Sequence, residues 1–89
     1  MIANGFNRYN SQHLKERIMQ KINFNVEGEF VELNQLLKLV GLCDSGGAGK
    51  LIVASGDVKV DGKQELRKTA KIRPGQMVEL GDVQIRVEA

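Results

Sequence analysis

Six basic side chains cluster in the second half of the chain. They are Lys59, Lys63, Arg67, Lys68, Lys71 and Arg73. Only Asp61 and Glu65 are acidic in the range 58–73, which therefore carries a net charge of +4, whereas the whole chain of 89 residues carries +2. Lysine and arginine neutralise phosphates and release the counterions of a nucleic acid. The cluster predicts a surface for a polyanion, with a solvated basic face as the alternative.

A glycine-rich segment, Ser45–Lys50 (SGGAGK), precedes this cluster. Asp44 or Ser45 can cap a helix there, but each interior glycine costs a helix about 1 kcal/mol relative to alanine. Two explanations stay open. Either another helix packs so closely that side chains do not fit, or the amides at the helix start bind a phosphate.

The residues usual in catalysis or metal binding do not form a pattern. His13 stands alone among polar residues, and Cys43 is the one cysteine. We expect Cys43 to be a small buried residue where two helices meet. Gly46–Lys50 lacks the spacing G-x-x-x-x-G-K-[ST] of a nucleotide-binding loop. We therefore expect no enzyme activity, no metal and no cofactor.

Two short helices must position the basic cluster. Leu33, Leu36, Leu37 and Val40 recur at helical spacing and predict a helix over Phe30–Val40, ended by Gly41. A second helix is expected from the cap at 44–45 to about Ser55, with Gly56 as its stop. Its expected inner face consists of Ala48, Leu51 and Ile52.

The remaining segments alternate between apolar and polar residues, as half-buried strands do. Asp61-Gly62 predicts a type I′ hairpin turn, and Pro74-Gly75 predicts a type II turn. The expected strands are Ile22–Val26, Val58–Val60, Gln76–Leu80 and Val83–Val87, with Gly81-Asp82 as a further turn. The predicted fold class is α+β: two short packed helices on a small, twisted, mostly antiparallel sheet.

The first 21 residues are polar and offer few apolar anchors. We expect a flexible or weakly ordered extension over 1–21 and a single domain over 22–89. Met1–Gln20 has no apolar core of a signal peptide, and no run approaches the roughly 20 apolar residues of a membrane span. A single cysteine allows no internal disulfide, so we expect a cytoplasmic protein. We also expect a monomer.

Residues 31–80 resemble the S4 RNA-binding domain family. The family pattern is a helix, a Gly-Leu step, a second helix, G-x-V-x-V-x-G, and a later turn with P-G. It is matched here by Gly41-Leu42, by Gly56, Val58, Val60 and Gly62, and by Pro74-Gly75. About 50 residues share this spacing, and the short length is similar to that of the small stand-alone bacterial members.

The resemblance implies an αL motif that binds structured RNA, either rRNA or tRNA, and an association with the ribosome and translation. The matching contact positions are Ser45, Lys50, Lys59, Lys71 and Arg73, and charge adds Lys63, Arg67 and Lys68. We therefore expect docking on RNA through the helix start Ser45–Lys50 and the hairpin Lys59–Arg73. Two cations usual in the family are missing. Glu32-Leu33-Asn34 replaces Arg-Leu-Asp, and Ser45-Gly46 replaces Ser-Arg.

The aromatic residues Phe6, Tyr9, Phe24 and Phe30 lie outside the basic cluster. We expect Phe24 and Phe30 in the core, and RNA recognition through the backbone with little base readout. The alternative is a protein-interaction adaptor that uses the helical face around Glu32 and Gly46, which the missing cations favour. A third reading, a specificity module acting in trans with an enzyme, rests on family analogy alone.

Overall fold

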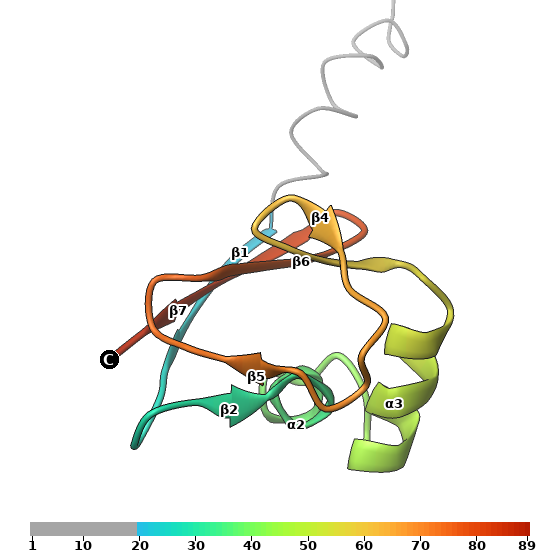
Figure 1. The fold of residues 1–89 in the computed structure, drawn as a ribbon, viewed down its shortest axis with the longest axis horizontal. Helices are drawn as coiled ribbons and strands as arrows, with labels where there is room; N and C mark the ends of the chain where they lie inside the picture. Colours follow the sequence, from blue (N-terminus) through green and yellow to red (C-terminus); the bar gives the residue numbers. More distant parts are fainter. Residues whose placement is uncertain (1–19) are drawn as a thin grey trace, which may run out of the picture.

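The structure is a computed structural model that describes residues 20–89. Figure 1 shows the arrangement of its elements. In chain order they are β1 (Gln20–Asn25), β2 (Val31–Glu32), α2 (Leu33–Leu39), α3 (Gly46–Ala54), β3 (Val58–Val60), β4 (Lys63–Gln64), β5 (Lys71–Ile72), β6 (Met77–Leu80) and β7 (Val83–Glu88). Gln20 and Lys21, which we assigned to the extension, begin β1. The rest of the extension, with His13, Phe6 and Tyr9, lies outside the described residues.

Five strands form one sheet in the order β1-β7-β6-β3-β4. Every neighbouring pair is antiparallel except β1 and β7, which run parallel with Ile22 opposite Ile85. In Figure 1 the sheet crosses the top of the molecule, and α2, α3 and the β2–β5 pair lie below it. The predicted fold class, two short helices on a mostly antiparallel sheet, is confirmed.

The turns take the predicted forms. Asp61 and Gly62 both have positive φ, 53° and 85°, as a type I′ turn requires. Gly75 has a φ of 98°, and the N–H of Gln76 donates to the carbonyl of Arg73 at 3.2 Å, as in a type II turn. The hairpin is also tied to β6, since the Asp61 carboxylate accepts from the Met77 N–H at 3.0 Å. That bond, with a second from Gln76, lowers the pKa of Asp61.

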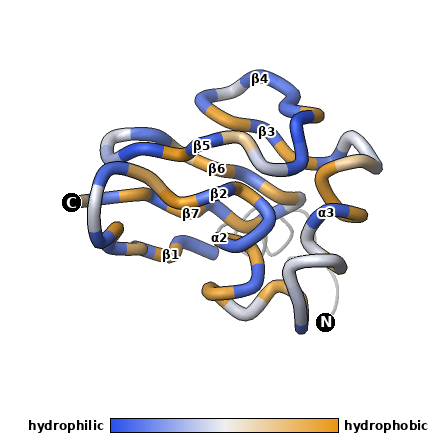
Figure 2. Tube along the Cα trace, turned by 60° about the horizontal axis from the view of Figure 1, so that its bottom comes forward, coloured by the Kyte–Doolittle hydropathy of each residue, from blue (hydrophilic) through white to orange (hydrophobic). Residues whose placement is uncertain are grey.

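The core lies between the sheet and the helices. Alternate strand residues point into it: Val58 and Val60, Val78, and Ile85 and Val87 are buried. Figure 2 shows this alternation of hydrophobic and hydrophilic residues along the strands. Leu33, Leu36 and Leu37 of α2 and Val53 of α3 complete the core, each with no exposed surface.

The two helices pack very closely, which explains the glycine-rich start of α3. Ser45 caps α3, because its Oγ accepts from the Ala48 N–H at 3.1 Å. Gly49 is buried, and a Cβ at this position would overlap the backbone carbonyl oxygen of Asn34. The close-packing explanation is thus confirmed for Gly49. Neither helix of residues 20–89 has the length and apolar character that crossing a membrane requires.

Two predictions about the helices were wrong. Phe30–Glu32 is not helical: Val31 and Glu32 form β2 and pair with Ile72 and Lys71 of β5, so α2 begins only at Leu33. Its first amides are satisfied by the loop before β5, since the N–H of Leu33 donates to the Ala70 carbonyl at 2.8 Å. Leu51 does not face inward but is 74% exposed, because Gly49 and Val53 occupy the contact with α2 and the core.

Replacing Gly49 by alanine tests the helix contact. We expect Gly49→Ala to lower the free energy of unfolding by about 1–3 kcal/mol or more, because α3 must move away from α2. Gly47→Ala is the matched control. Its new Cβ would meet only Ser45 Oγ, at 3.9 Å, so it should be neutral or stabilising by up to about 1 kcal/mol. Urea unfolding measures both, and equal stability of Gly49→Ala and the parent would contradict the close packing.

Candidate nucleic-acid interface

Asn34, at the start of α2, is hydrogen-bonded to both the start of α3 and the loop 65–70, two segments that carry predicted site residues. Its side-chain Nδ2 donates to the Gly46 carbonyl at 3.2 Å, and its backbone N–H donates to the Lys68 carbonyl at 3.2 Å. The start of α3 and the loop 65–70 therefore meet at one buried residue, which is 2% exposed. Figure 1 shows the loop running from β4 past α3 to β5.

The amide of Asn34 suits this position better than a carboxylate would. An ionised carboxylate only accepts hydrogen bonds, so it could not donate to the Gly46 carbonyl. The fit is incomplete, because Asn34 Oδ1 is buried without a hydrogen-bond partner among residues 20–89. A buried acceptor without a partner offsets part of the stability that the Nδ2 bond contributes.

Lys68 and Lys71 lie on either side of the loop end that covers α2. The Lys68 carbonyl accepts a hydrogen bond from the Asn34 N–H. Lys71 stands opposite Glu32, the residue just before α2, in the backbone pairing of β2 with β5. Both lysines are exposed, as are Ser45, Lys50 and Arg73. We call these five residues the basic surface: Ser45, Lys50, Lys68, Lys71 and Arg73. Of the eight predicted site residues, Lys68 and Lys71 thus lie beside the start of α2, Ser45 and Lys50 belong to the first turns of α3 that pack on it, and Arg73 follows two residues after Lys71.

Arg67 lies in the same loop, but its charge is already paired. Its guanidinium donates two hydrogen bonds of 2.9 Å to the Glu65 carboxylate. These bonds lower the pKa of Glu65 from 4.5 to about 2. Arg67 therefore contributes less to a phosphate-binding surface than its sequence position indicated. Within residues 20–89 this is the only ion pair between side chains.

Lys59 lies on the wrong face for the basic surface. Its neighbours Val58 and Val60 are buried toward the helices, so Lys59 projects from the opposite, outer face of the five-stranded sheet. Across the strands it stands opposite Glu79 and Gln64. Lys63, at the start of β4, is exposed in the hairpin. It stands opposite Val60, so its side chain and that of Lys59 point to opposite faces of the sheet.

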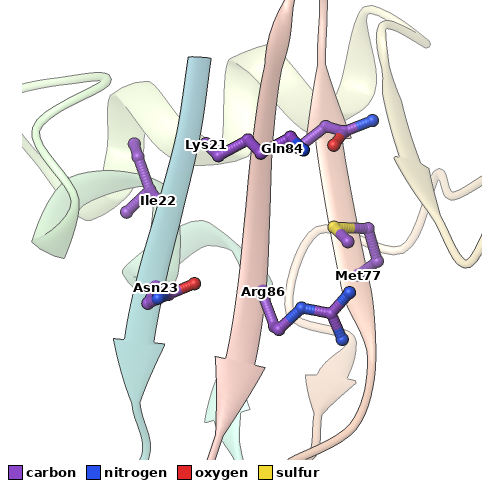
Figure 3. A pocket seen from close by; sticks show the side chains of 6 residues that line it. All are labelled: Lys21, Ile22, Asn23, Met77, Gln84 and Arg86. Carbon is purple, nitrogen blue, oxygen red and sulfur yellow. The ribbon is translucent and has the colours of Figure 1, made fainter. Parts of the chain in front are cut away.

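The outer face holds two cations that sequence reasoning missed. Lys21 and Arg86 border a shallow basin of about 140 Å³, with Asn23, Met77 and Gln84. Figure 3 shows Arg86 and Met77 side by side there, while Ile22 points away. The alternation in Val83–Val87 would have placed Arg86 outside, but the parallel pairing of β1 with β7 has no local signal. Because Glu79 lies among these cations, the outer face is mixed in charge.

Phe30 is the second feature that the sequence did not reveal. The ring is half-buried and lies beside two cations of the basic surface. Lys71 Nζ is 5.0 Å and Arg73 Cζ is 5.7 Å from the ring centroid. The expectation that Phe30 is a core residue was therefore wrong, whereas Phe24 does pack against the core. The pairing of β2 with β5, which no local pattern predicts, is the cause.

Residues with other chemistry remain isolated. Cys43 is half-buried against the core, and its thiol donates to the Ser45 carbonyl at 3.4 Å. Among the described residues no three histidine, cysteine, aspartate or glutamate side chains are grouped to hold a metal ion.

Comparison with known proteins now gives the family. Residues 24–88 match the family model of the S4 domain. The chain belongs to the S4 domain family. It is 48% identical over 59 residues to the "Putative RNA-binding protein YbcJ" of Escherichia coli strain K12. The aligned residues cover 66% of this chain and 84% of the relative. A YbcJ protein of Shigella flexneri matches to the same extent.

A solved structure agrees with the fold. The solution structure of YbcJ from E. coli superimposes with a TM-score of 0.58 at 36% identity, covering 100% of this chain and 98% of that chain. It is described as revealing an αL motif involved in RNA binding. The two-helix arrangement derived above is thus that of an S4 family member.

The ion pair of Glu65 and Arg67 predicts a pH dependence. Because the pKa of Glu65 is lowered in the folded state, its contribution to stability is present above about pH 4.5 and is lost as the pH falls toward 2. Since Arg67 is 80% exposed, screening by solvent keeps this contribution small. Urea unfolding of the parent and Arg67→Gln should differ at pH 7, and the difference should shrink below about pH 4.5 as the pH falls toward 2. A difference that does not change with pH would contradict this pairing.

Proposed function

We propose that this chain is a non-enzymatic, cytoplasmic protein that binds structured RNA, rRNA or tRNA, through the basic surface at the start of α2. One observation carries the proposal. Asn34 holds the start of α3 and the loop 65–70 together, and the exposed cations Lys50 and Lys68 belong to the two segments that meet there. Membership of the S4 family and the RNA-binding role ascribed to YbcJ support it.

The binding mechanism is electrostatic docking on the phosphate backbone. Lys50, Lys68 and Lys71 each carry one charge at the end of a flexible stem and can reach separate phosphates. The major groove of an RNA helix is deep and narrow, so proteins recognise paired RNA mostly through its shape, phosphates and 2′-hydroxyls. Exposed cations on neighbouring segments can contact the phosphates of such a target.

Two cations that are usual in the family are missing at Glu32 and Gly46. Their absence changes which residues of this surface should supply most of the phosphate contacts. Glu32 is exposed next to α2, and it stands opposite Lys71 in the β2–β5 pair. Phosphate contacts should therefore come mainly from the loop 65–70 and β5, with Lys50 as the contribution of α3.

A second candidate function, a protein-interaction adaptor, is favoured by one observation. Leu51 is 74% exposed on α3, and Leu66 in the neighbouring loop is 55% exposed. Single exposed leucines are common on soluble proteins, so this observation carries less weight than the gathered cations. The experiment below separates the two functions, because an adaptor does not require a salt-dependent affinity for RNA.

Charge reversal at matched positions tests the proposed surface. Lys68→Glu and Lys71→Glu should each weaken binding to a folded rRNA or tRNA fragment by about tenfold and reduce the salt slope by about 1 or more. Lys59→Glu makes the same change of charge on the outer face and should have a much smaller effect, since salt screens distant charges. Fluorescence anisotropy at about 50 and about 200 mM salt measures all three.

Two results would contradict the proposal. If the parent chain does not bind RNA at the lower salt concentration, RNA is not its partner. If Lys59→Glu weakens binding as much as Lys68→Glu, the outer face takes part and the basic surface is placed incorrectly.

A further inference from the structure

Phe30 belongs to the exposed face of the β2–β5 pair. Val31 and Ile72 stand opposite each other and face the core, whereas Glu32 and Lys71 form the next pair. In an antiparallel pair this register continues with Phe30 opposite Arg73, and alternate residues share a face. The ring therefore lies on the same face as Lys71 and Arg73, which agrees with the distances of 5.0 and 5.7 Å.

The Phe30 ring is half-buried, so part of it remains accessible. It borders a hollow of about 360 Å³, together with Phe24, Leu39 and the carboxylate-bearing Glu27. Leu39 is 57% exposed, so the surface around the hollow is apolar and accessible. Phe30 is not part of the buried core, and its ring thus combines an accessible apolar surface with two adjacent cations.

We infer that Phe30 is a stacking platform for one unpaired base of a bound RNA, with Lys71 and Arg73 on the phosphates beside that base. This inference rests on the proposed RNA-binding function and goes beyond it, because it names the kind of RNA. Bases inside an RNA helix are stacked on each other, whereas unpaired bases can stack on an aromatic side chain. The preferred target is therefore a helix with an unpaired nucleotide next to it.

The charges around the ring support a nucleotide in one orientation. Phosphates are attracted to Lys71 and Arg73, whereas Glu27 in the hollow repels them and can accept a hydrogen bond from an amino group of a base. When phosphates draw the two cations away from the ring, its face becomes free for the base. This replaces the expectation of little base readout, which assumed that no aromatic residue lies near the cations.

The experiment compares two RNAs that differ in one feature. One is a stem with a single-stranded extension, and the other is the same stem fully paired. Phe30→Leu keeps an apolar side chain but removes the ring. It should bind the extended stem about 5- to 100-fold more weakly than the parent does, and bind the paired stem equally well. Leu51→Ala, which removes an exposed apolar side chain that lies outside this hollow, is the matched control and should change neither affinity by more than about twofold.

Phe30→Trp gives an independent readout, since the chain has no other tryptophan. It should keep the affinity of the parent, and its emission should be quenched by the extended stem but not by the paired stem. An extended stem with abasic sites in the extension keeps the phosphates but lacks the bases, so it should bind the parent as weakly as Phe30→Leu binds the intact extension.

The outcomes distinguish this inference from the proposed function. If Phe30→Leu binds both RNAs as the parent does, or loses the same affinity for both, Phe30 is not a stacking platform, although RNA binding stands. If the parent binds neither RNA, the proposed function and this inference both fail. Thermal unfolding of each variant checks that a loss of affinity is not a loss of fold.

Discussion

The contact between α2 and α3 at Asn34 is the constraint on which the rest of the structure depends. The backbone of Asn34 leaves no room for a side chain at Gly49, and its amide group bonds to the carbonyl of Gly46. Two helices of 7 and 9 residues are too short to be stable alone. They persist because they pack on each other and bury Leu33, Leu36, Leu37 and Val53 against the sheet.

The same contact determines which cations can act together. The loop 65–70 gives its carbonyls to the first amides of α2, and this fixes Lys68 and Lys71 beside the start of α2. Lys59 follows the alternation of β3 and is directed to the other side of the sheet. The basic residues are continuous in the sequence, but the fold divides them. Some belong to the basic surface, Arg67 forms an ion pair with Glu65 in the same loop, and Lys59 lies on the outer face of the sheet, which carries both positive and negative charges.

Local signals predicted most of the fold correctly. The turns at Asp61-Gly62 and Pro74-Gly75, the cap at Ser45 and the alternation of β3 and β7 each depend on a few adjacent residues, so the sequence shows them directly. The pairing of β2 with β5 joins Val31 to Ile72 and Glu32 to Lys71, which are far apart in the sequence, and it has no local signal. For this reason the first helix was predicted too long, and Phe30 was assigned to the core and not to the neighbourhood of Lys71 and Arg73.

The central claim is that RNA docks around the start of α2 and not on the outer face of the sheet. The most direct measurement is a titration of the isotope-labelled chain with a folded RNA stem, followed by the backbone amide signals in NMR spectra. The account predicts that amides of residues 45–50 and 66–73 shift together with one affinity, while those of Lys59, Gln84 and Arg86 remain unchanged. Shifts confined to the outer face, or the absence of any shift, would contradict it.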